Sequence, residues 1–580
     1  MKFGQLARRI AIVSLGSSLV SSGWMAIARP ALAKKSLLEP DSTDPLTPLL
    51  LSQNAPASEL SEPEGEPSPL PETAPVLPTS PPEPPPATSA SEASSEGRVD
   101  VIDVQVVGSS LFSERDFEPI VAPYEGRSLG LRDLRQVAND ITQVYLSSGY
   151  ITSRAVLSEQ TIANGVVQVR VVEGELEEIK VEGTQRLTGY VRSRLNLANR
   201  KPLSQAALES QLQLLRADPL FEQIEASLRA GTGEGQSQLI VRVLEAPALS
   251  GRAVFDTYSP PSVGVARLGV EANYNNPFGL GDRLSLSAYG TVAGGSETYG
   301  ISYDLPLNAL NGTLQARYLP SSFSLISDEL STLDVHGASD TYGLTYRQPI
   351  IRQPNEELAF SVGFRHRTGE TLISDRVIDS TRTSVVQLGQ DYLRRDQSGA
   401  WGVRSLFSLG TGLLDATSRD NGEADGQFFS WLGQIQRAQV MTPDNLLLLQ
   451  GSVQLSANSL LGAEQFIIGG ANSVRGYDQN ARFGDNGFRA SVEDRITVLH
   501  NDDGSPATQI APFLDAAVVW NQGAIANDQT FLLGTGVGII ANLVDRVEAR
   551  FDVGVPLMRL NEGGDRNQSA LMYFSLDYRF

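Results

Sequence analysis

The sequence contains no cysteine and only three histidines, His336, His366 and His500. Without cysteine, the chain has no disulfide framework, no thiolate metal site and no cysteine nucleophile. The three histidines have no metal-ligand spacing and no partner that would make one of them a general base. There is also no Gly-x-Ser-x-Gly element and no phosphate-binding Gly-x-x-x-x-Gly-Lys element. The sequence therefore predicts no enzyme, metal, cofactor or nucleotide site.

Basic residues are also fewer than acidic residues. The 580 residues include 67 Asp and Glu against 46 Lys and Arg, which gives a formal net charge of −21. Nucleic-acid binding needs a Lys/Arg surface that neutralises phosphates, so no nucleic-acid partner is expected. The length exceeds that of one compact domain, and several domains are therefore expected.

Long apolar runs are absent after the N-terminus. Residues 1–33 are predicted to be a signal peptide, because basic residues and a weakly apolar stretch precede the small-residue site Ala31-Leu32-Ala33. An N-terminal anchor helix is the alternative, but Gly16 and Gly23 interrupt the apolar stretch. No later segment has the about 20 uncharged apolar residues that a spanning helix needs. A membrane-embedded form of this protein must therefore be a β-barrel.

Residues 34–98 are predicted to be a proline-rich, disordered linker. Between Pro56 and Pro86, 12 of 31 residues are proline, mixed with Glu, Ser, Thr and Ala. Such a composition cannot bury a core and favours extended polyproline geometry. We expect the linker to act as a semi-rigid spacer.

Residues 99–174 have the pattern of a small α+β domain. Val101–Gly108 is a predicted strand, and the apolar spacing from Leu131 to Tyr145 predicts an amphipathic helix. Two further strands, Thr152–Leu157 and Val166–Val172, complete the order strand, helix, helix, strand, strand.

The same order returns over residues 175–246. An internal repeat of this size indicates tandem modules. The predicted elements are the strand Leu176–Gly183, the helices Leu187–Leu197 and Ser204–Ala217, and the strands Phe221–Arg229 and Gln238–Glu245.

From residue 249 to residue 580, apolar and polar residues alternate with period two. The last strand, for example, places Met572, Phe574 and Leu576 on one face and Ser575 and Asp577 on the other. Charges confined to one face fit strands with lipid outside and water inside. A soluble β-sandwich also alternates, but it rarely keeps this rhythm for so long. Runs separated by turn residues predict a transmembrane barrel of about 16 antiparallel strands.

One segment, around residues 464–487, breaks this rhythm. It contains a double glycine, Gly469-Gly470, and then Val474-Arg475-Gly476-Tyr477, which together indicate a folded loop. Val-Arg-Gly-Tyr in this place resembles the loop-six motif of outer-membrane protein transporters that carry POTRA domains. Tyr145-Leu-Ser-Ser-Gly149-Tyr150, followed by Val-Val-Glu173-Gly174, is similar to the first POTRA module of two-partner secretion transporters, the ShlB/FhaC/HecB (TpsB) family.

The resemblance implies a latch between this loop and the barrel wall. In the family, the loop folds into the lumen and its arginine meets the aspartate of a Phe-x-Asp-x-Gly motif. Here Phe513-Leu514-Asp515-Ala516-Ala517 lies in the predicted thirteenth strand, with Phe513 and Asp515 on the lumenal face. An Arg475–Asp515 pair would be charge-assisted and would hold the loop without an apolar core. Ala517 replaces the glycine of the motif where the tip of the loop is expected to approach.

The resemblance also implies contact with an extended polypeptide. A POTRA module has an exposed strand edge that can add a strand from another chain. We expect first contact on Val101–Val107, the helix Leu131–Tyr145 and the strand Thr152–Leu157, although most apolar positions there also fill the core of the module. The candidate substrate-binding residues are Val104, Val106, Leu134, Ile141, Tyr145, Tyr150 and Ala155.

Both ends of the chain have implied roles. In two-partner transporters an N-terminal helix can plug the pore, and residues 36–53 are the candidate segment, although three prolines disfavour a continuous helix there. Tyr578 and Phe580 match the C-terminal aromatic signal that the barrel assembly machinery recognises.

The family implies secretion of a large, unfolded partner protein, a β-helical adhesin or cytolysin, through the barrel without ATP. The barrel would lie in outer-membrane lipid and the POTRA modules in the periplasm. One alternative is a BamA-like assembly factor, which shares loop six but typically has more POTRA modules. A passive porin is the second alternative, although it would lack periplasmic modules.

Overall fold

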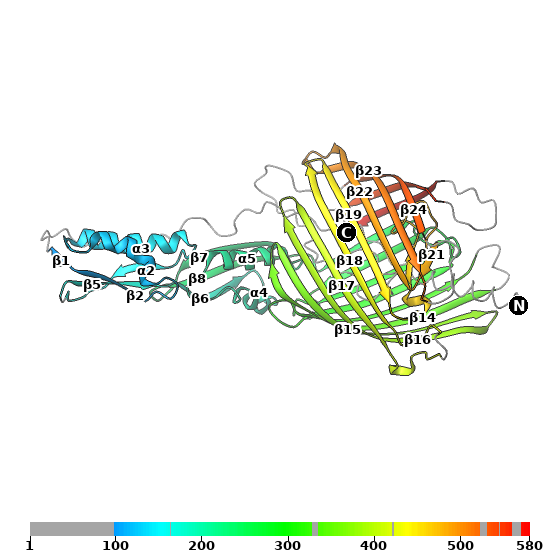
Figure 1. The fold of residues 1–580 in the computed structure, drawn as a ribbon, viewed down its shortest axis with the longest axis horizontal. Coiled ribbons are helices and arrows are strands. Elements are labelled where there is room, and N and C mark those ends of the chain that lie inside the picture. Colours follow the sequence, from blue (N-terminus) through cyan, green and yellow to red (C-terminus); the bar gives the residue numbers. More distant parts are fainter. Residues whose placement is uncertain are drawn as a thin grey trace. The chain divides into compact units, whose positions relative to one another are not determined.

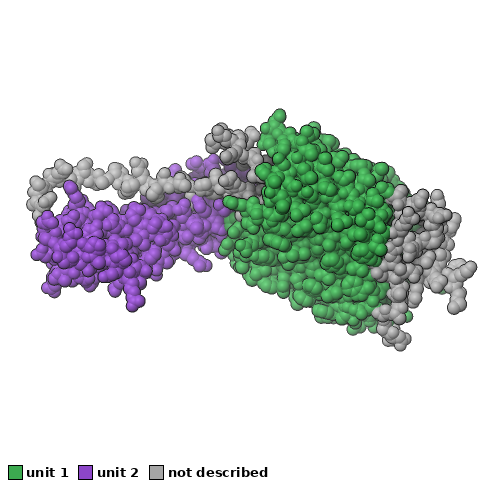
Figure 2. Space-filling view, turned by 45° about the horizontal axis from the view of Figure 1, so that its top comes forward, with its two compact units in different colours: residues 1–39, 45–72, 247–580 green, residues 40–44, 73–246 purple. Residues whose placement is uncertain are grey.

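The computed structural model describes residues 98–162, 164–326, 334–419, 423–522, 531–544, 546–558 and 570–580. These residues fall into two compact units that meet in sequence between Ala246 and Pro247 (Figure 2). The predicted signal peptide and the linker, including the candidate plug at residues 36–53, lie outside the described residues. No helix in the described ranges has both the length and the apolar composition needed to cross a bilayer.

The first module is a small sheet with two helices packed on it (Figure 1). The order β2-β5-β4 places β5 in the centre, parallel to β2 and antiparallel to β4. The predicted strand 101–108 is interrupted at Ile102, whose backbone N–H donates to Gly165 O at 2.7 Å. The elements are β1 (Val99–Val101), β2 (Asp103–Val107), α2 (Glu114–Val121), β3 (Arg127–Leu129), α3 (Leu131–Ser147), β4 (Arg154–Leu157) and β5 (Val166–Val172).

The amphipathic helix predicted in this module is confirmed as α3. It begins after Gly130, whose N–H donates to the Asp133 carboxylate at 2.9 Å. It ends shortly before Gly149, which has a φ of +82°, a conformation that favours glycine.

The second module repeats the order of the first. Its sheet has the order β6-β8-β7, and the inward face of α5 buries Leu208, Leu212 and Leu215. The elements are β6 (Glu175–Glu182), α4 (Thr188–Leu195), α5 (Gln205–Arg216), β7 (Phe221–Ala230) and β8 (Gln236–Glu245).

The second unit is a closed antiparallel barrel, as the alternation predicted. Among the described residues, sixteen strands pair in sequence order, and β26 pairs with β9 to close the ring. The strands are β9 (Leu249–Asp256), β10 (Arg267–Asn275), β11 (Arg283–Thr291), β12 (Ser296–Pro306), β13 (Thr313–Ser324), β14 (Val335–Gln353), β15 (Glu356–Ile373), β16 (Arg376–Asp396), β17 (Gly399–Thr411), β18 (Phe429–Thr442), β19 (Asn445–Ser456), β22 (Asn486–His500), β23 (Pro506–Trp520), β24 (Phe531–Val544), β25 (Val547–Pro556) and β26 (Leu571–Arg579).

Neighbouring residues along each strand have opposite surroundings. In β10, Leu268 and Val270 are about half exposed, whereas Arg267 is buried. In β23, Leu514 is 48% exposed and the adjacent Asp515 is 0% exposed. The apolar residues form the outer face of the barrel and the charged residues face the lumen, which is the pattern of a membrane barrel.

The barrel closes through its shortest strand pairing. The β9–β26 register runs only from Ser575 to Arg579 on β26, and the N–H of Phe580 then donates to Gly251 O at 2.9 Å. The rings of Tyr578 and Phe580 are both partly exposed, with centroids 6.2 Å apart. The two aromatic residues of the predicted assembly signal therefore lie on the outer face of the last strand.

Candidate functional site

The segment between β19 and β22 forms a hairpin that lies against the lumenal wall. Its two short strands, β20 (Phe466–Ile468) and β21 (Arg482–Gly484), pair with each other. Its apolar side chains pack on lumen-facing residues of β17, β18, β23 and β24, so the expectation that the loop has no apolar core is wrong. The cluster consists of Phe466, Ile468, Val474 and Tyr477 from the loop and Leu406, Leu432, Ala517, Val519 and Leu532 from the wall.

Arg475 and Asp515 form the pair that the family resemblance implies. Arg475 Nε donates to Asp515 Oδ2 at 2.7 Å, and Nη2 donates to Oδ1 at 2.9 Å. The backbone N–H of Arg475 donates to the same carboxylate at 3.1 Å. The guanidinium lies 3.4 Å from the centroid of the Phe513 ring. Both charged side chains are at least 95% buried, so the geometry is a bidentate, desolvated ion pair.

This pair belongs to a larger ionic cluster, in which Glu493 of β22 is central. Glu493 accepts from Arg475 Nη1 at 2.5 Å, from Arg495 Nε at 2.9 Å and from Arg550 Nη2 at 2.7 Å. Arg550 Nε also donates to Asp552 at 2.7 Å. The cluster therefore joins the arginines 475, 495 and 550 to the carboxylates 493, 515 and 552, and its formal charges balance.

The backbone of the loop tip approaches two glycines on the wall. A Cβ built on Gly534 of β24 would overlap the carbonyl oxygen of Arg475, and a Cβ on Gly554 of β25 would overlap the N–H of Gly476. Ala517, which the sequence analysis identified as a departure from the motif, is 1% exposed within the apolar cluster. The close approach therefore depends on glycines of β24 and β25, and the alanine at 517 is accommodated.

Gly476 and Tyr477 connect the tip to the last strands. Gly476 has a φ of +101°, and its N–H donates to the hydroxyl of Tyr573 at 2.9 Å. The Tyr573 hydroxyl in turn donates to Tyr477 O at 2.7 Å. The Tyr477 hydroxyl donates to Met558 O at 2.6 Å. The segment Val474–Tyr477, which we call the loop latch, thus contacts β23, β24, β25 and β26.

Sequence reasoning missed most of the wall side of the latch. Glu493, Arg495, Arg550 and Asp552 all occupy the buried, lumen-facing parity of their strands, and Tyr573 does so on β26. That parity was visible in the sequence. What was not visible is which of the lumenal charges meet, because the strands are brought together only when the barrel closes.

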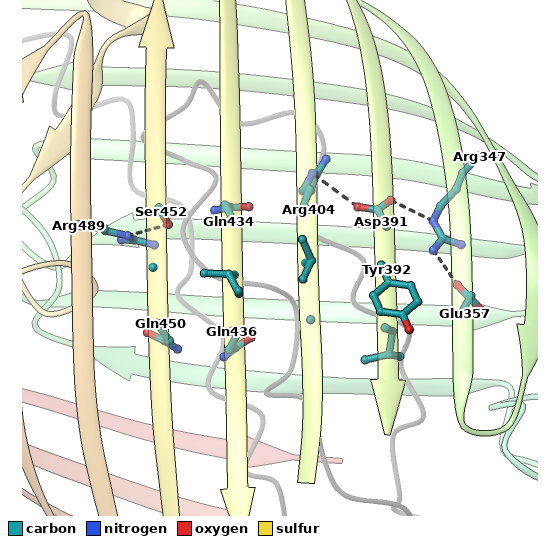
Figure 3. Close-up of a pocket in the computed structure, with 15 residues that line it drawn as sticks. Arg347, Glu357, Asp391, Tyr392, Arg404, Gln434, Gln436, Gln450, Ser452 and Arg489 are labelled. Carbon is teal, nitrogen blue, oxygen red and sulfur yellow. Dashed lines mark hydrogen bonds and ion pairs between the residues drawn. The ribbon is translucent and has the colours of Figure 1, made fainter. Parts of the chain in front are cut away.

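A row of polar side chains continues from the latch around the wall (Figure 3). Arg489 of β22 donates to Asn472 O in the loop at 2.7 Å and to the hydroxyl of Ser452 at 3.3 Å. Further along, Asp391 lies between Arg404 and Arg347, with the Arg347 contact at 3.4 Å. The lumen next to the loop is therefore lined by charged and amide groups.

The candidate substrate-binding residues of the first module are mainly core residues. Val104, Leu134, Ile141, Tyr145 and Ala155 are at most 8% exposed and pack together, and Val106 and Tyr150 are partly buried against them. The side chains of the five buried residues hold the module together and are not available on its surface. The strand β4 lies at the edge of the sheet, where only one of its sides is paired with another strand.

A buried carboxylate links the end of α3 to the rest of this module. Glu173 accepts from the N–H of Ser110 at 2.6 Å and from the Tyr145 hydroxyl at 3.1 Å. Burial is the largest cause that raises the pKa of Tyr145 to about 12, and the charge of Glu173 adds to it. The Tyr145 and Glu173 of the recognised sequence motifs are thus direct partners.

No three His, Asp or Glu side chains in the described part of the chain are arranged to hold a metal ion.

The chain resembles known outer-membrane transporters in sequence and in fold. Residues 235–541 match the haemolysin secretion/activation protein family ShlB/FhaC/HecB, and residues 99–174 match the ShlB-type POTRA domain. The outer membrane transporter CdiB of Escherichia coli is 27% identical over 403 residues, which cover 67% of each chain. The hemolysin transporter protein ShlB of Serratia marcescens is 24% identical over 432 residues, which cover 72% of this chain and 75% of that one.

A solved structure of CdiB from Escherichia coli shares the fold, with a TM-score of 0.66 at 22% identity. The alignment covers 88% of this chain and 94% of that chain. The family match alone spans more than half of the sequence. With its POTRA module, its sixteen-stranded barrel and its lumenal loop, the chain belongs to the haemolysin secretion/activation protein family ShlB/FhaC/HecB.

Proposed function

We propose that this protein binds an unfolded partner polypeptide in the periplasm and secretes it through the lumen of its barrel. As a member of its family, it is an outer-membrane transporter of two-partner secretion that acts with a secreted partner protein, and its POTRA modules are periplasmic. The observation that carries the mechanism is the lumenal loop, whose tip is bound to the wall by a buried, bidentate ion pair. We propose a large β-helical adhesin or cytolysin as the partner.

The loop latch gives the pore a closed state that is stable but reversible. Arg475 and Asp515 are both desolvated, and each compensates the charge of the other. Breaking the pair without a replacement costs about 3–5 kcal/mol in a buried site. A polypeptide that enters the lumen brings backbone and side-chain groups that can take over these contacts. The latch would therefore open when the partner chain is present and close when it has passed.

The periplasmic modules would capture the partner through backbone pairing. The edge strand β4 (Arg154–Leu157) lies at the border of the sheet β2-β5-β4 and pairs with a strand on one side only. Adding a strand there is tolerant of sequence, which suits an extended chain. Of the predicted contact residues, only Val106 and Tyr150 keep partial exposure, and we assign the others to the core.

No nucleotide and no enzymatic step enter the proposal. We infer that folding of the partner outside the cell makes transport unidirectional. The exposed apolar face of the barrel would contact outer-membrane lipid, and Tyr578 and Phe580 would serve the barrel assembly machinery during insertion.

The two alternatives are less well supported. A BamA-like assembly factor would have more modules than the two repeats between Val99 and Ala246. A passive porin would need neither these modules nor a latch whose arginine reaches two carboxylates.

The genes that lie next to this one provide the first test of the proposal. We expect a large secreted β-helical protein beside it, and we expect surface delivery of that protein to stop when this gene is deleted. Reintroduction of the wild-type gene should restore delivery, whereas an inserted barrel without residues 99–246 should not. Continued delivery of the partner in the deletion strain would sink the proposed function.

A further inference from the structure

The loop has a second charged contact with the wall, at its base. Glu464 ends the short helical turn η4 (Gly462–Glu464), and Arg365 lies inside β15. Arg365 Nη2 donates to the two carboxylate oxygens of Glu464 at 2.7 and 2.5 Å. The two side chains are 1% and 5% exposed, and the Thr383 hydroxyl of β16 adds a contact at 3.4 Å. Here the loop supplies the anion and the wall the cation, the reverse of the loop latch.

The two contacts lie on opposite sides of the strands from which the loop emerges. The loop leaves β19 and returns to β22, which are neighbours in the barrel. Asp515 is on β23, the next strand after β22, whereas β15 and β16 are separated from β19 by β17 and β18 (Figure 1). The Glu464 ion pair therefore reaches in one direction around the wall and the Arg475 ion pair in the other.

Further bonds brace the base. Gln454 of β19 donates to Glu464 O at 3.0 Å and to Asp485 O at 3.2 Å. The Asp485 carboxylate accepts from the N–H groups of Leu460 and Gln522 at 2.9 and 2.8 Å. These contacts tie both arms of the hairpin to the wall close to the point where the loop begins and ends.

Two consecutive glycines lie between the braced base and the tip. Gly469 and Gly470 both have a φ of +103°, a conformation that glycine adopts without the strain other residues would incur. A Cβ on Gly469 would stand only 2.6 Å from the Cβ of Ala481 on the returning arm. The two arms therefore cross closely at this point, and the residues beyond it form a separate tip.

We propose that Arg365 and Glu464 are positioning residues that form a fixed base anchor for the loop. On this arrangement only the tip, Ala471–Gln479, leaves the wall when a partner chain passes, and it turns about Gly469 and Gly470. A tip that remains tethered at its base returns to Asp515 by an intramolecular step, which makes re-latching fast. The inference rests on the proposed function for what passes the pore. The closed state that the anchor maintains exists without any partner.

The first test is the ionic current through the purified full-length protein in planar lipid bilayers. Glu464→Gln leaves Arg365 buried without its counter-charge, so we expect the open fraction of pores to rise about tenfold or more. Asp379→Asn is the matched control, because it removes the carboxylate of a partly buried pair with Arg419, 3.1 Å apart, from β16, the strand that also carries Thr383. We expect the control current to equal that of the wild type. An unchanged current in Glu464→Gln would overturn the inference.

A crosslink separates loss of the anchor from loss of folding. The Cβ of a residue at 484 would lie 3.1 Å from the Cβ of Val519 and 3.0 Å from the backbone N and O of Trp520. A small outward shift of the returning arm relieves this approach and brings the two Cβ atoms to the distance of a disulfide. Because the chain has no cysteine, Gly484→Cys with Val519→Cys introduces the only two thiols. In the Glu464→Gln background, we expect oxidation to return the current to the wild-type level and reduction to raise it again. An equal current through the oxidised and the reduced protein would contradict the proposed base anchor.

The same crosslink tests whether the base stays fixed during transport. In an otherwise wild-type chain, we expect the oxidised protein to secrete its partner at the wild-type level. A block of secretion that reduction relieves would show that the base must move, and it would overturn the inference. If the wild-type protein itself secretes no partner, the proposed function is wrong. The current measurements still show whether Arg365 and Glu464 form a base anchor, because they need no partner.

Discussion

The most direct prediction concerns the glycines under the loop latch. In Gly534→Ala, the new methyl group would overlap the carbonyl oxygen of Arg475 and lie 3.1 Å from its carbonyl carbon. In Gly554→Ala, the methyl group would overlap the N–H of Gly476 and lie 2.8 Å from the same carbon. Carbon atoms prefer a separation of about 3.5–4.0 Å, so the tip must retreat by roughly 1 Å.

This displacement of the tip is large compared with the range of distances over which the hydrogen bonds between Arg475 and Asp515 stay strong. The bonds from Arg475 to Asp515 are 2.7 and 2.9 Å long, and hydrogen bonds of this type weaken beyond about 3.2 Å. Overpacking of a well-filled site costs about 1–3 kcal/mol. Each variant should therefore lower the ratio of latched to released loop by about tenfold to a hundredfold, at about 1.4 kcal/mol per factor of ten.

The assay combines secretion with hydrogen exchange of residues 471–479 in the purified protein. We expect both variants to form a heat-modifiable barrel, to lose amide protection at the tip and to secrete less partner. The control is Gly369→Ala in β15, where the nearest atoms to the new methyl group are 3.5 Å away. Wild-type protection of the tip in both latch variants would refute the argument that the backbone needs these glycines.

Further variants test the other contacts. Arg475→Ala and Asp515→Ala should each leave a heat-modifiable barrel but impair secretion, because each leaves the opposite charge buried; normal secretion in both would remove the pair from the mechanism. Tyr573→Phe deletes the hydroxyl between Gly476 N and Tyr477 O, so the amide of Gly476 should lose about 1 kcal/mol of protection in hydrogen exchange, and unchanged protection would contradict the bridge. Tyr145 binds its proton more tightly when folded, so its contribution is complete below pH 10 and is lost as pH rises toward 12. Over that interval the first module should lose about 2–3 kcal/mol of stability, measured by proteolysis of the full-length protein, and Tyr145→Phe should abolish this loss.

The architecture of the barrel could be predicted because it follows from local pattern. Alternation is a property of adjacent residues, so the sequence alone predicts that Leu514 and Asp515 lie on opposite faces of their strand. Likewise, the spacing from Leu131 to Tyr145 is enough to define an amphipathic helix. The interruption at Ile102 was missed because one bend leaves the alternation of the flanking residues almost intact.

The contacts of the latch could be predicted only in part. The motif resemblance paired Arg475 with Asp515, but no local pattern pairs Glu493 with Arg550, which are 57 residues apart. The sequence also contains no sign that Gly534 leaves room for the backbone of the loop tip. A glycine within a strand weakens the strand, and only the structure shows that a second backbone packs against it.

For the candidate contact residues of the first module, sequence pattern alone could not separate contact from core. Apolar periodicity identifies a face, but it does not tell whether that face meets the core of its own module or another chain. Ile141 and Tyr145 lie fully within the core. Backbone edges, which carry no sequence signature, are the better guide to where a chain can be added.

The balanced charges around Glu493 have an electrical consequence. With the loop in place, three arginines face three carboxylates. The tip as a whole is neutral, because it carries Asp478 as well as Arg475, but its withdrawal removes Arg475 from this cluster. Two arginines of the wall then face three carboxylates, which leaves the wall around Glu493 with one uncompensated negative charge. The open pore should consequently prefer cations more strongly than the closed one. The reversal potential across a salt gradient would then report the position of the loop without a label, while a partner chain is in transit.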